Sequence, residues 1–220
     1  MQDDDLLYGE DGNDSVQGGD DGDMLFGNAG TDLLLGNVGA DTLFGRRGTD
    51  TVFGGRDDDV LYGDGGNDQL HGDRGSDTLV GADDSDRLTG GDVSDLLLGN
   101  MGVDTLFGGR GDDTLFVGRD DDRLSGDAGD DQLWGDGGND TLTGGDGADV
   151  FAFSGASGHD MVDDFSIADG DRMGLAAGAT YTVRSNGAGD AVIVFSNDDD
   201  VTLSGIVAAQ VDATWFLTLS

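Results

Sequence analysis

Acidic and apolar positions recur along this chain with a period of nine residues. An aspartate stands at every ninth position from Asp5 to Asp149, and an apolar residue follows each one two positions later, from Leu7 to Phe151. No insertion interrupts this frame across 145 residues. A short fixed period indicates one small structural unit that is stacked on copies of itself. The pattern therefore predicts a solenoid whose interior is made by the apolar positions.

Counted from its first glycine, the repeat unit has the form G-x-x-G-x-D-x-U-x, where U is apolar, as in residues 27–35. Glycine holds the first place of every unit from Gly9 to Gly144 except at Val117. The fourth place is usually glycine, and the second is often Gly, Asn or Asp, residues that accept a positive φ. The first six places thus predict a tight turn, and the last three, in which only U faces inward, a very short strand. Two units make one coil of a right-handed solenoid, so strands 18 residues apart stack in one sheet.

The unit resembles the nonapeptide repeat of RTX (repeats-in-toxin) proteins, a calcium-binding parallel β-roll. The resemblance covers residues 1–152 and implies an all-β fold in which a right-handed parallel β-roll of two sheets is followed by a small β-rich cap. A disordered Gly/Asp linker is the alternative, but disorder does not require an apolar residue in register with every aspartate. Without calcium, we expect the chain to be disordered.

The resemblance also implies where calcium binds. Each ion would lie between two stacked turns, bound by the sixth-place aspartates and by carbonyls of the glycine-rich segments. The implied carboxylate ligands are Asp14, Asp23, Asp32, Asp41, Asp50, Asp59, Asp68, Asp77, Asp86, Asp95, Asp104, Asp113, Asp122, Asp131, Asp140 and Asp149. The implied carbonyl ligands include those of Gly27, Gly30, Gly36, Gly39, Gly45, Gly48, Gly63, Gly66, Gly72, Gly75, Gly99, Gly102, Gly126, Gly129, Gly135 and Gly138.

The charge of the chain favours bound metal independently of any resemblance. The net charge is −37, Glu10 is the only glutamate, and all ten cations are arginines. A compact fold with this charge would repel itself strongly. Asp has the short reach needed beside its own turn, and Ca²⁺ takes six to eight oxygens, many of them carbonyls. About fourteen gaps between turns would take about fourteen ions, which would bring the net charge to about −9.

The chain lacks the residues that several classes of function require. There is no Cys, no His-Glu-x-x-His motif, no Lys for a phosphate-binding loop, and no Glu to end an EF-hand loop. His71 is expected on the surface of the roll and His159 just after it. The chain itself is therefore predicted not to be an enzyme, and no nucleic-acid partner is expected. If the chain is a fragment, a catalytic domain would have to lie upstream.

The chain shows neither an apolar run of twenty residues nor an N-terminal signal peptide, since Met1 is followed at once by the repeat. RTX proteins generally leave bacteria by a type I secretion pathway that recognises an uncleaved C-terminal signal. The missing leader agrees with that route and with secretion to the extracellular space, and equally with a fragment whose Met1 is artificial.

Aspartate replaces the fourth-place glycine at Asp21, Asp57, Asp84 and Asp120. These aspartates either add a ligand oxygen or are merely tolerated, because Asp accepts a positive φ better than most residues. Val93 occupies the same place and is strained there, because a β-branched residue disfavours positive φ. We expect a distorted, weak or empty ion site beside residues 90–95.

One outer face of the roll is expected to be a continuous apolar ladder. Large exposed apolar patches usually mark an interface. A partner domain, a second copy or the C-terminal segment is therefore expected to cover this ladder. Alternatively, the aromatic residues simply stack on one another. The ninth-place residues on this face include Tyr8, Phe26, Phe44, Tyr62, Phe116 and Trp134.

After residue 152 the frame ends, and residues 153–220 are predicted to be a β-rich cap that covers the last coil. Strands are expected near 180–184, 191–196, 201–206 and 214–219, with turns at 185–187 and 197–200. The last residues resemble an export signal. Five aspartates either hold one further ion or are solvated turn residues: Asp160, Asp163, Asp164, Asp169 and Asp171.

Two functions remain open at this point. The first is an RTX module that folds on calcium after export by the type I secretion machinery and stabilises a larger extracellular bacterial protein. Calcium is low in the cytosol and abundant outside, so binding energy becomes folding energy after export. The second is a structural or adhesive protein of the cell surface or surface layer, which uses the apolar face as its interface.

Overall fold

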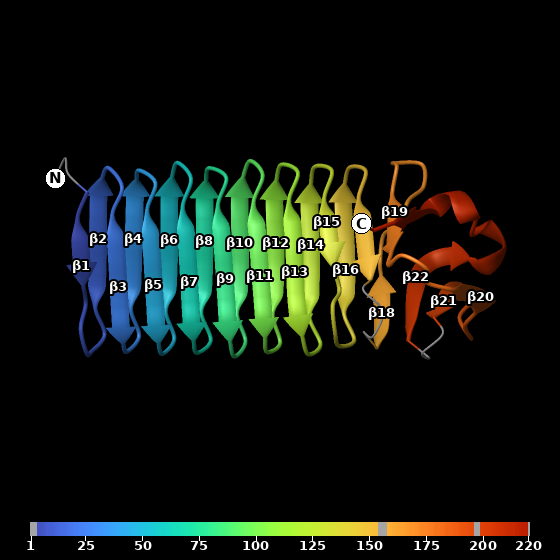
Figure 1. The fold of residues 1–220 in the computed structure, drawn as a ribbon, viewed down its shortest axis with the longest axis horizontal. Helices are drawn as coiled ribbons and strands as arrows, with labels where there is room; N and C mark the ends of the chain where they lie inside the picture. Colours follow the sequence, from blue (N-terminus) through green and yellow to red (C-terminus); the bar gives the residue numbers. More distant parts are fainter. Residues whose placement is uncertain (1–3, 154–157, 196–198, 220) are drawn as a thin grey trace.

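The computed structural model describes residues 4–153, 158–195 and 199–219. It is a parallel β-solenoid with two long sheets whose strands alternate along the sequence, so that each coil gives one strand to each sheet (Figure 1). Odd-numbered strands of the roll form the first sheet and even-numbered strands the second. The predicted all-β fold and its two sheets are confirmed.

The first sheet has eleven strands. In spatial order they are β1 (Leu6–Tyr8), β3 (Met24–Ala29), β5 (Thr42–Arg47), β7 (Val60–Gly65), β9 (Thr78–Asp83), β11 (Leu96–Met101), β13 (Thr114–Arg119), β15 (Gln132–Trp134), β17 (Val150–Phe153), β19 (Arg172–Leu175) and β23 (Phe216–Thr218).

The second sheet has twelve strands. Their spatial order is β2 (Ser15–Asp20), β4 (Leu33–Val38), β6 (Thr51–Arg56), β8 (Gln69–Arg74), β10 (Arg87–Asp92), β12 (Thr105–Arg110), β14 (Arg123–Ala128), β16 (Thr141–Asp146), β18 (His159–Val162), β22 (Asp200–Val207), β21 (Asp190–Phe195) and β20 (Tyr181–Ser185). Two short 3₁₀ helices, η1 (Ala208–Gln210) and η2 (Ala213–Trp215), precede β23.

The apolar U positions stack into the interior. Leu25 pairs in register with Leu7 on one side and with Leu43 on the other, 18 residues away each time. From Leu25 to Phe151, these side chains are between 0% and 3% exposed. Each strand therefore contributes one residue of this apolar line, and the core is narrow for a chain of this length.

The strands are longer than the sequence suggested. Most contain six residues and run from the seventh place of one unit to the third place of the next, as β3 does. Asn28 and Ala29 pair with Arg46 and Arg47 in the following coil, although Asn28 has φ 79°. The predicted six-residue turn is wrong, because backbone pairing between coils extends the strand and leaves only the fourth to sixth places for the turn.

Both sheets continue past Phe153 into the C-terminal residues. In the first sheet, β19 and β23 add in parallel after β17, and in the second, β18 and β22 add in parallel after β16. Strands β21 and β20 then turn back antiparallel. The four expected C-terminal strands are present as β20 to β23, whereas β18 and β19 were not anticipated.

Two turns were expected between these antiparallel strands. The first is present, since the side-chain Oδ1 of Asn186 accepts bonds from the amides of Ala188, Gly189 and Asp190. The second, at 197–200, lies partly outside the described residues.

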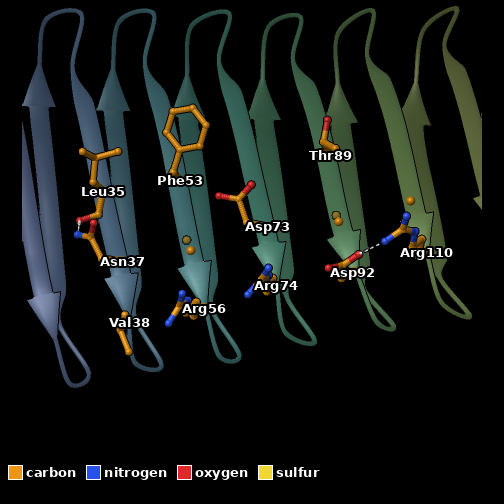
Figure 2. Close-up of a pocket in the computed structure, with 15 residues that line it drawn as sticks. Leu35, Asn37, Val38, Phe53, Arg56, Asp73, Arg74, Thr89, Asp92 and Arg110 are labelled. Carbon is orange, nitrogen blue, oxygen red and sulfur yellow. Dashed lines mark hydrogen bonds and ion pairs between the residues drawn. The ribbon is translucent and has the colours of Figure 1, made fainter.

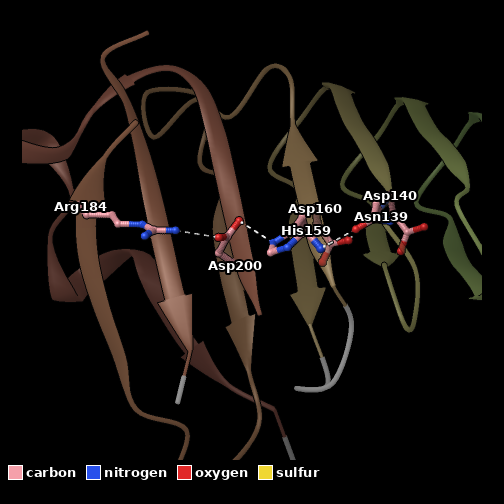
Figure 3. A network of polar contacts seen from close by, with 6 residues as sticks. All are labelled: Asn139, Asp140, His159, Asp160, Arg184 and Asp200. Atoms are coloured by element: carbon pink, nitrogen blue, oxygen red, sulfur yellow. Dashed lines mark hydrogen bonds and ion pairs between the residues drawn. The ribbon is translucent and has the colours of Figure 1, made fainter. Parts of the chain in front are cut away.

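A small polar network ties the C-terminal strands to the last coil (Figure 3). Asp200 on β22 contacts Arg184 on β20 at 3.0 Å and His159 on β18 at 3.4 Å. The amide of His159 donates to Oδ1 of Asn139 in the preceding turn at 3.0 Å. Antiparallel and parallel strands are thus linked at the point where the repeat frame ends.

The outer face of the first sheet carries the expected aromatic ladder. Tyr8, Phe26, Phe44 and Tyr62 stack at 4.8–4.9 Å between ring centroids, and Arg46 lies over two of the rings. The described strands of the C-terminal segment extend the end of the rod (Figure 1) and add to the two sheets in place of lying over this face. Of the three covers expected for the ladder, these strands therefore do not provide one, because they pair with the last strands of the sheets.

Candidate metal sites along the aspartate ladders

The sixth-place aspartates form two hydrogen-bonded ladders inside the turns, one along each edge of the roll. Oδ1 of Asp41 accepts the backbone amide of Asp23 at 2.7 Å, and the amide of Asp41 donates to Oδ1 of Asp59 at 2.8 Å. The same bond recurs along both edges from the amide of Asp5 to that of Asp149. One oxygen of each carboxylate is therefore used to align neighbouring coils.

From Asp14 to Asp149, the second oxygen of each sixth-place carboxylate is buried and has no donor. An unpaired polar atom in such a place costs free energy unless something else satisfies it. The sixth-place aspartates with a buried, unbonded Oδ2 are Asp14, Asp23, Asp32, Asp41, Asp50, Asp59, Asp68, Asp77, Asp86, Asp95, Asp104, Asp113, Asp122, Asp131, Asp140 and Asp149. They are the sixteen carboxylates that the sequence singled out, although their role as metal ligands remains a prediction.

The first-place glycine explains how this oxygen is accommodated. A Cβ added to Gly27 would lie 2.5 Å from Oδ2 of Asp32 and 2.8 Å from the carbonyl oxygen of Gly45 in the next coil. At Gly63 the corresponding distances, to Asp68 and Gly81, are 2.5 Å and 2.9 Å. A carboxylate oxygen and a carbonyl oxygen from stacked coils thus approach one spot that only glycine leaves open.

The fourth-place glycines are packed just as closely. The carbonyl of Gly48 faces the Cα of Gly66, and the carbonyl of Gly30 faces that of Gly48, so neither glycine has room for a side chain. Both have positive φ, 122° in each case. The first- and fourth-place glycines named from the sequence therefore all line the gaps between stacked turns, apart from Gly135, where the spacing is wider.

From Asp41 to Asp149, burial makes the ladder carboxylates harder to ionise in the absence of a cation. Desolvation raises the pKa of Asp59, Asp68 and Asp95 from 3.8 to about 8, with neighbouring aspartates of the ladder adding to the effect. The pKa of Asp86 rises to about 7 for the same reason. Amide donors oppose the rise but do not cancel it. Near neutral pH, burial therefore favours either a proton or a bound cation at these carboxylates.

The donor set suits a hard cation. No group of three or more His, Cys, Asp or Glu side chains in the described part of the chain converges as a metal site would require. A cation in these gaps would therefore depend on backbone carbonyls as well as carboxylates, which is the oxygen-rich environment that Ca²⁺ prefers. The unbonded Oδ2 atoms and the converging carbonyls of the glycine turns fit calcium in this way.

Sequence periodicity missed two members of the ladders. Oδ1 of Asp160 accepts the amide of Asp140, and Oδ1 of Asp171 accepts the amide of Asp149, both at 3.0 Å. Their separations of 20 and 22 residues break the frame of nine. A usable signal existed, because each is followed two places later by a buried apolar residue, Val162 or Met173.

Asp163 and Asp164, which lie between Asp160 and Asp171 in the sequence, have other partners. Both carboxylate oxygens of Asp164 accept amides, from Gly144 and Gly145, at 2.9 Å. Asp163 accepts the hydroxyl of Ser204 at 3.1 Å. These two side chains join the last regular coil and the C-terminal strands.

A second ladder runs on the exposed side of the turns. Fifth-place side chains accept the backbone amide of the fifth-place residue one coil later, as Asp58 does from Ser76 at 2.8 Å and Asp112 from Asp130 at 2.9 Å. In this outer ladder the donating amide belongs to the later coil, whereas in the inner ladder it belongs to the earlier coil. Where this bond is present, neighbouring coils are linked from both sides of the turn.

The irregular fourth places adopt the expected backbone conformation. Asp21, Asp57, Asp84 and Asp120 have φ between 74° and 81°, and Val93 has φ 81°. Oδ2 of Asp120 accepts the amide of Gly102 at 3.2 Å, so this side chain supports the neighbouring turn. The strain predicted at Val93 is present, and the weak ion site beside it stays a prediction.

A shallow groove crosses the outer face of the second sheet (Figure 2). Glycines form part of its floor, and Arg56 and Arg74 stand side by side along it in register. Arg110 is paired with Asp92 at 3.1 Å. Since Asp73 also lines it, the groove has mixed charge, and the buried carboxylates remain the distinctive chemistry of the molecule.

Family comparison agrees with this geometry. The model of the RTX calcium-binding nonapeptide repeat (4 copies) matches residues 1–34, 17–52, 26–61, 35–70, 44–79, 62–97, 80–115 and 116–151. Together these matches span the whole roll. The chain belongs to the family of RTX calcium-binding repeats, and its roll is a calcium-binding repeat module.

Solved structures with a similar arrangement include two bacterial proteins. The solution structure of the AlgE6R3 subunit of the mannuronan C5-epimerase from Azotobacter vinelandii is 27% identical, with 63% of this chain and 80% of that chain covered and a TM-score of 0.43. The crystal structure of the extracellular lipase LipA from Serratia marcescens is 18% identical, with 98% of this chain covered and a TM-score of 0.41. This chain spans 40% of the lipase. None of the curated proteins matches the chain.

Membrane insertion through a helix has no support in the described residues, because none of their helices has the length and apolarity to cross a bilayer.

Proposed function

We propose that this chain is a calcium-dependent folding module of a secreted bacterial protein, and that the sixteen buried aspartates are its main side-chain ligands. The observation that carries the proposal is the column of buried Oδ2 atoms that lack a donor. Bound calcium supplies positive charge and a preference for oxygen ligands in the gaps. The chain supplies paired coils, carbonyls and carboxylates that are already aligned by the Oδ1 ladder.

The folding switch follows from the cost of burying charge. Each ionised aspartate that enters the turn without a cation loses its hydration and gains no donor for Oδ2. The narrow core contributes one line of apolar side chains and offsets only part of this cost for sixteen such groups. Low calcium in the cytosol would leave the chain extended for export, and high calcium outside would drive folding.

We further propose that residues 153–220 cap the roll and present the export signal. Strands β18 and β19 pair with the last coil, and β22 and β23 pair with them in turn, so that these strands cover the open end of the roll. In this role the segment keeps the final backbone groups of the roll from remaining an unpaired edge. The module itself would have no catalytic role, and a catalytic domain would lie elsewhere in a larger protein.

Expression beside a type I exporter tests the secretion role. The chain should reach the medium when residues 213–220 are present and stay in the cell when they are deleted. A matched deletion within the roll, of residues 63–80, removes one coil and keeps the frame, so it should still be exported. Equal export of the full chain and the 213–220 deletion would exclude a signal at this end.

Calcium dependence is tested separately on the purified chain. Size-exclusion chromatography combined with light scattering should give a large hydrodynamic radius in chelator and a compact monomer mass in millimolar calcium. A compact particle of unchanged radius in both buffers would remove the basis of the switch.

A second function is favoured by one feature of the apolar ladder. Leu6, Tyr8 and Met24 at its N-terminal end are 58%, 53% and 41% exposed. In this alternative the chain is a structural or adhesive surface protein, and a neighbouring subunit packs on this end of the first sheet. Analytical ultracentrifugation in calcium should then show dimers that Met24→Gln dissociates, whereas a monomer at all concentrations would exclude this packing.

A further inference from the structure

Val117 is the single residue other than glycine at the first place of the units that begin between residues 9 and 144. It lies on β13 with its side chain 0% exposed, so it points into the roll. The preceding first-place residues of the same edge, Gly81 and Gly99, show what that position normally contains. The unit that begins at Val117 can therefore be compared directly with the units that begin at Gly81 and Gly99.

In a regular unit the space next to the first-place Cα is occupied by oxygens. A Cβ added to Gly99 would lie 2.5 Å from Oδ2 of Asp104 and 2.7 Å from the carbonyl oxygen of Val117. Real Cβ atoms essentially never come within 3.0 Å of a heavy atom outside their own residue and its two chain neighbours. The converging pair of oxygens therefore requires glycine at the first place.

At the next unit of this edge, valine supplies a Cβ and two methyl groups in that space. Asp122, the carboxylate of the unit, remains in its ladder position, since its Oδ1 accepts the amide of Asp104 at 2.7 Å and its own amide donates to Asp140 at 2.9 Å. It is 2% exposed. Methyl groups thus stand where the two nearest atoms of a regular gap, as at Gly99, are oxygens.

The following coil differs in the same direction. A Cβ added to Gly135 would lie 3.3 Å from Oδ2 of Asp140, and its next neighbours are side-chain carbons of Leu142 and Phe153, each at 3.4 Å. In the regular gap at Gly99, both of the nearest atoms are oxygens. The next gap of this edge, beyond Gly135, is therefore also more apolar than the regular gap at Gly99.

The opposite edge shows no such change at the same height of the roll. A Cβ added to Gly126 would contact Oδ2 of Asp131 and would lie 2.6 Å from the carbonyl oxygen of Gly144, as in regular units. Within the repeat frame, the valine itself alters one gap of one edge, between residues 117–125 and 135–143.

We infer that the gap between residues 117–125 and 135–143 binds no calcium, so that the ion column of this edge is interrupted there while that of the other edge continues. The inference rests on the proposed calcium-binding function. Methyl groups offer no lone pair, and a cation that keeps them as neighbours loses hydration without gaining a ligand. The last coil before the C-terminal strands is then held at this edge by apolar packing in place of an ion.

The test is a count of bound calcium by equilibrium dialysis with elemental analysis of the full chain and of Val117→Gly. The variant should bind one more ion per chain than the wild type. The reverse substitution at a regular unit, Gly81→Val, is the matched control and should bind one ion fewer. If Gly81→Val does not fold, the comparison of the wild type with Val117→Gly still decides the question.

Crystals grown in calcium give a second, positional readout. Anomalous scattering should show an ion between Asp122 and Asp140 in Val117→Gly and none there in the wild type. An unchanged ion count in Val117→Gly, or an ion in this gap of the wild type, would overturn the inference and leave the proposed function intact. A wild type that binds no calcium at all would instead defeat both.

Discussion

Lowering the pH should fold this chain in the absence of calcium. Burial raises the pKa of the ladder aspartates from Asp41 to Asp149, so the folded state holds protons that the unfolded chain has released. Stability that comes from a raised carboxyl pKa is complete below the unfolded value of 3.8 and is lost as the pH rises through the folded values. In calcium-free buffer, the folded roll should therefore appear as the pH falls from 8 towards 5 and should be lost again on return.

The expected size of this effect is large. The folded pKa lies between about 6 and about 8 for twelve aspartates of the roll. Each proton bound only by the folded state changes the free energy of unfolding by about 1.4 kcal/mol per pH unit. Twelve give about 16 kcal/mol per pH unit near pH 5, and a third of that number would still give about 5 kcal/mol.

Far-UV circular dichroism combined with potentiometric titration measures this directly. The calcium-free chain should gain its β signal between pH 8 and pH 4.5 in a steep transition, with net uptake of several protons per chain. With saturating calcium the β signal should already be complete at pH 8. A calcium-free chain that stays unfolded down to pH 4.5, or folds with no excess proton uptake, would refute the view that buried carboxylates oppose folding.

Three substitutions probe single parts of the same account. Asp59→Asn should lose one or two of the bound ions and lower the Tm in calcium, whereas Asp58→Asn, an equal charge change on the exposed ladder, should leave the ion count unchanged; equal losses would contradict the assignment. Leu79→Ala removes a fully buried side chain and should cost about 2–5 kcal/mol, seen as a Tm lower by about 5–15 °C, while Thr78→Ala should change the Tm little. Val93→Gly should relieve about 1 kcal/mol of strain at φ 81° and raise the Tm by a few degrees, and a lowered Tm would show that the valine is not strained.

The sequence was sufficient for the fold because one pattern repeats without interruption. Every unit has its aspartate and its apolar residue at fixed places, so the assignment of Leu25 to the core and of Phe26 to the outer ladder follows from alternation alone. The two sheets follow equally from the separation of 18 residues between stacked units. Repetition supplied the long-range pairing that an irregular sequence leaves undetermined.

What the sequence did not determine depends on contacts between coils. The continuation of β3 through Asn28 at positive φ requires the pairing of the next coil, which local propensity opposes. Asp160 and Asp171 join the ladders at irregular spacing, because the chain makes longer excursions between the last coils. The effect of Val117 also needed the structure, since only the positions of the neighbouring oxygens show what a side chain displaces.

The central claim is that the buried carboxylates of the roll bring it to a stable fold only with bound cations at neutral pH. A calcium titration at pH 7.5, followed by circular dichroism and by ion counting on the same sample, tests this most directly. The account predicts an unfolded chain in chelator, a cooperative gain of β structure with many ions bound per chain, and full reversal when chelator is added. A chain that keeps its β signal and its Tm in excess chelator would contradict it.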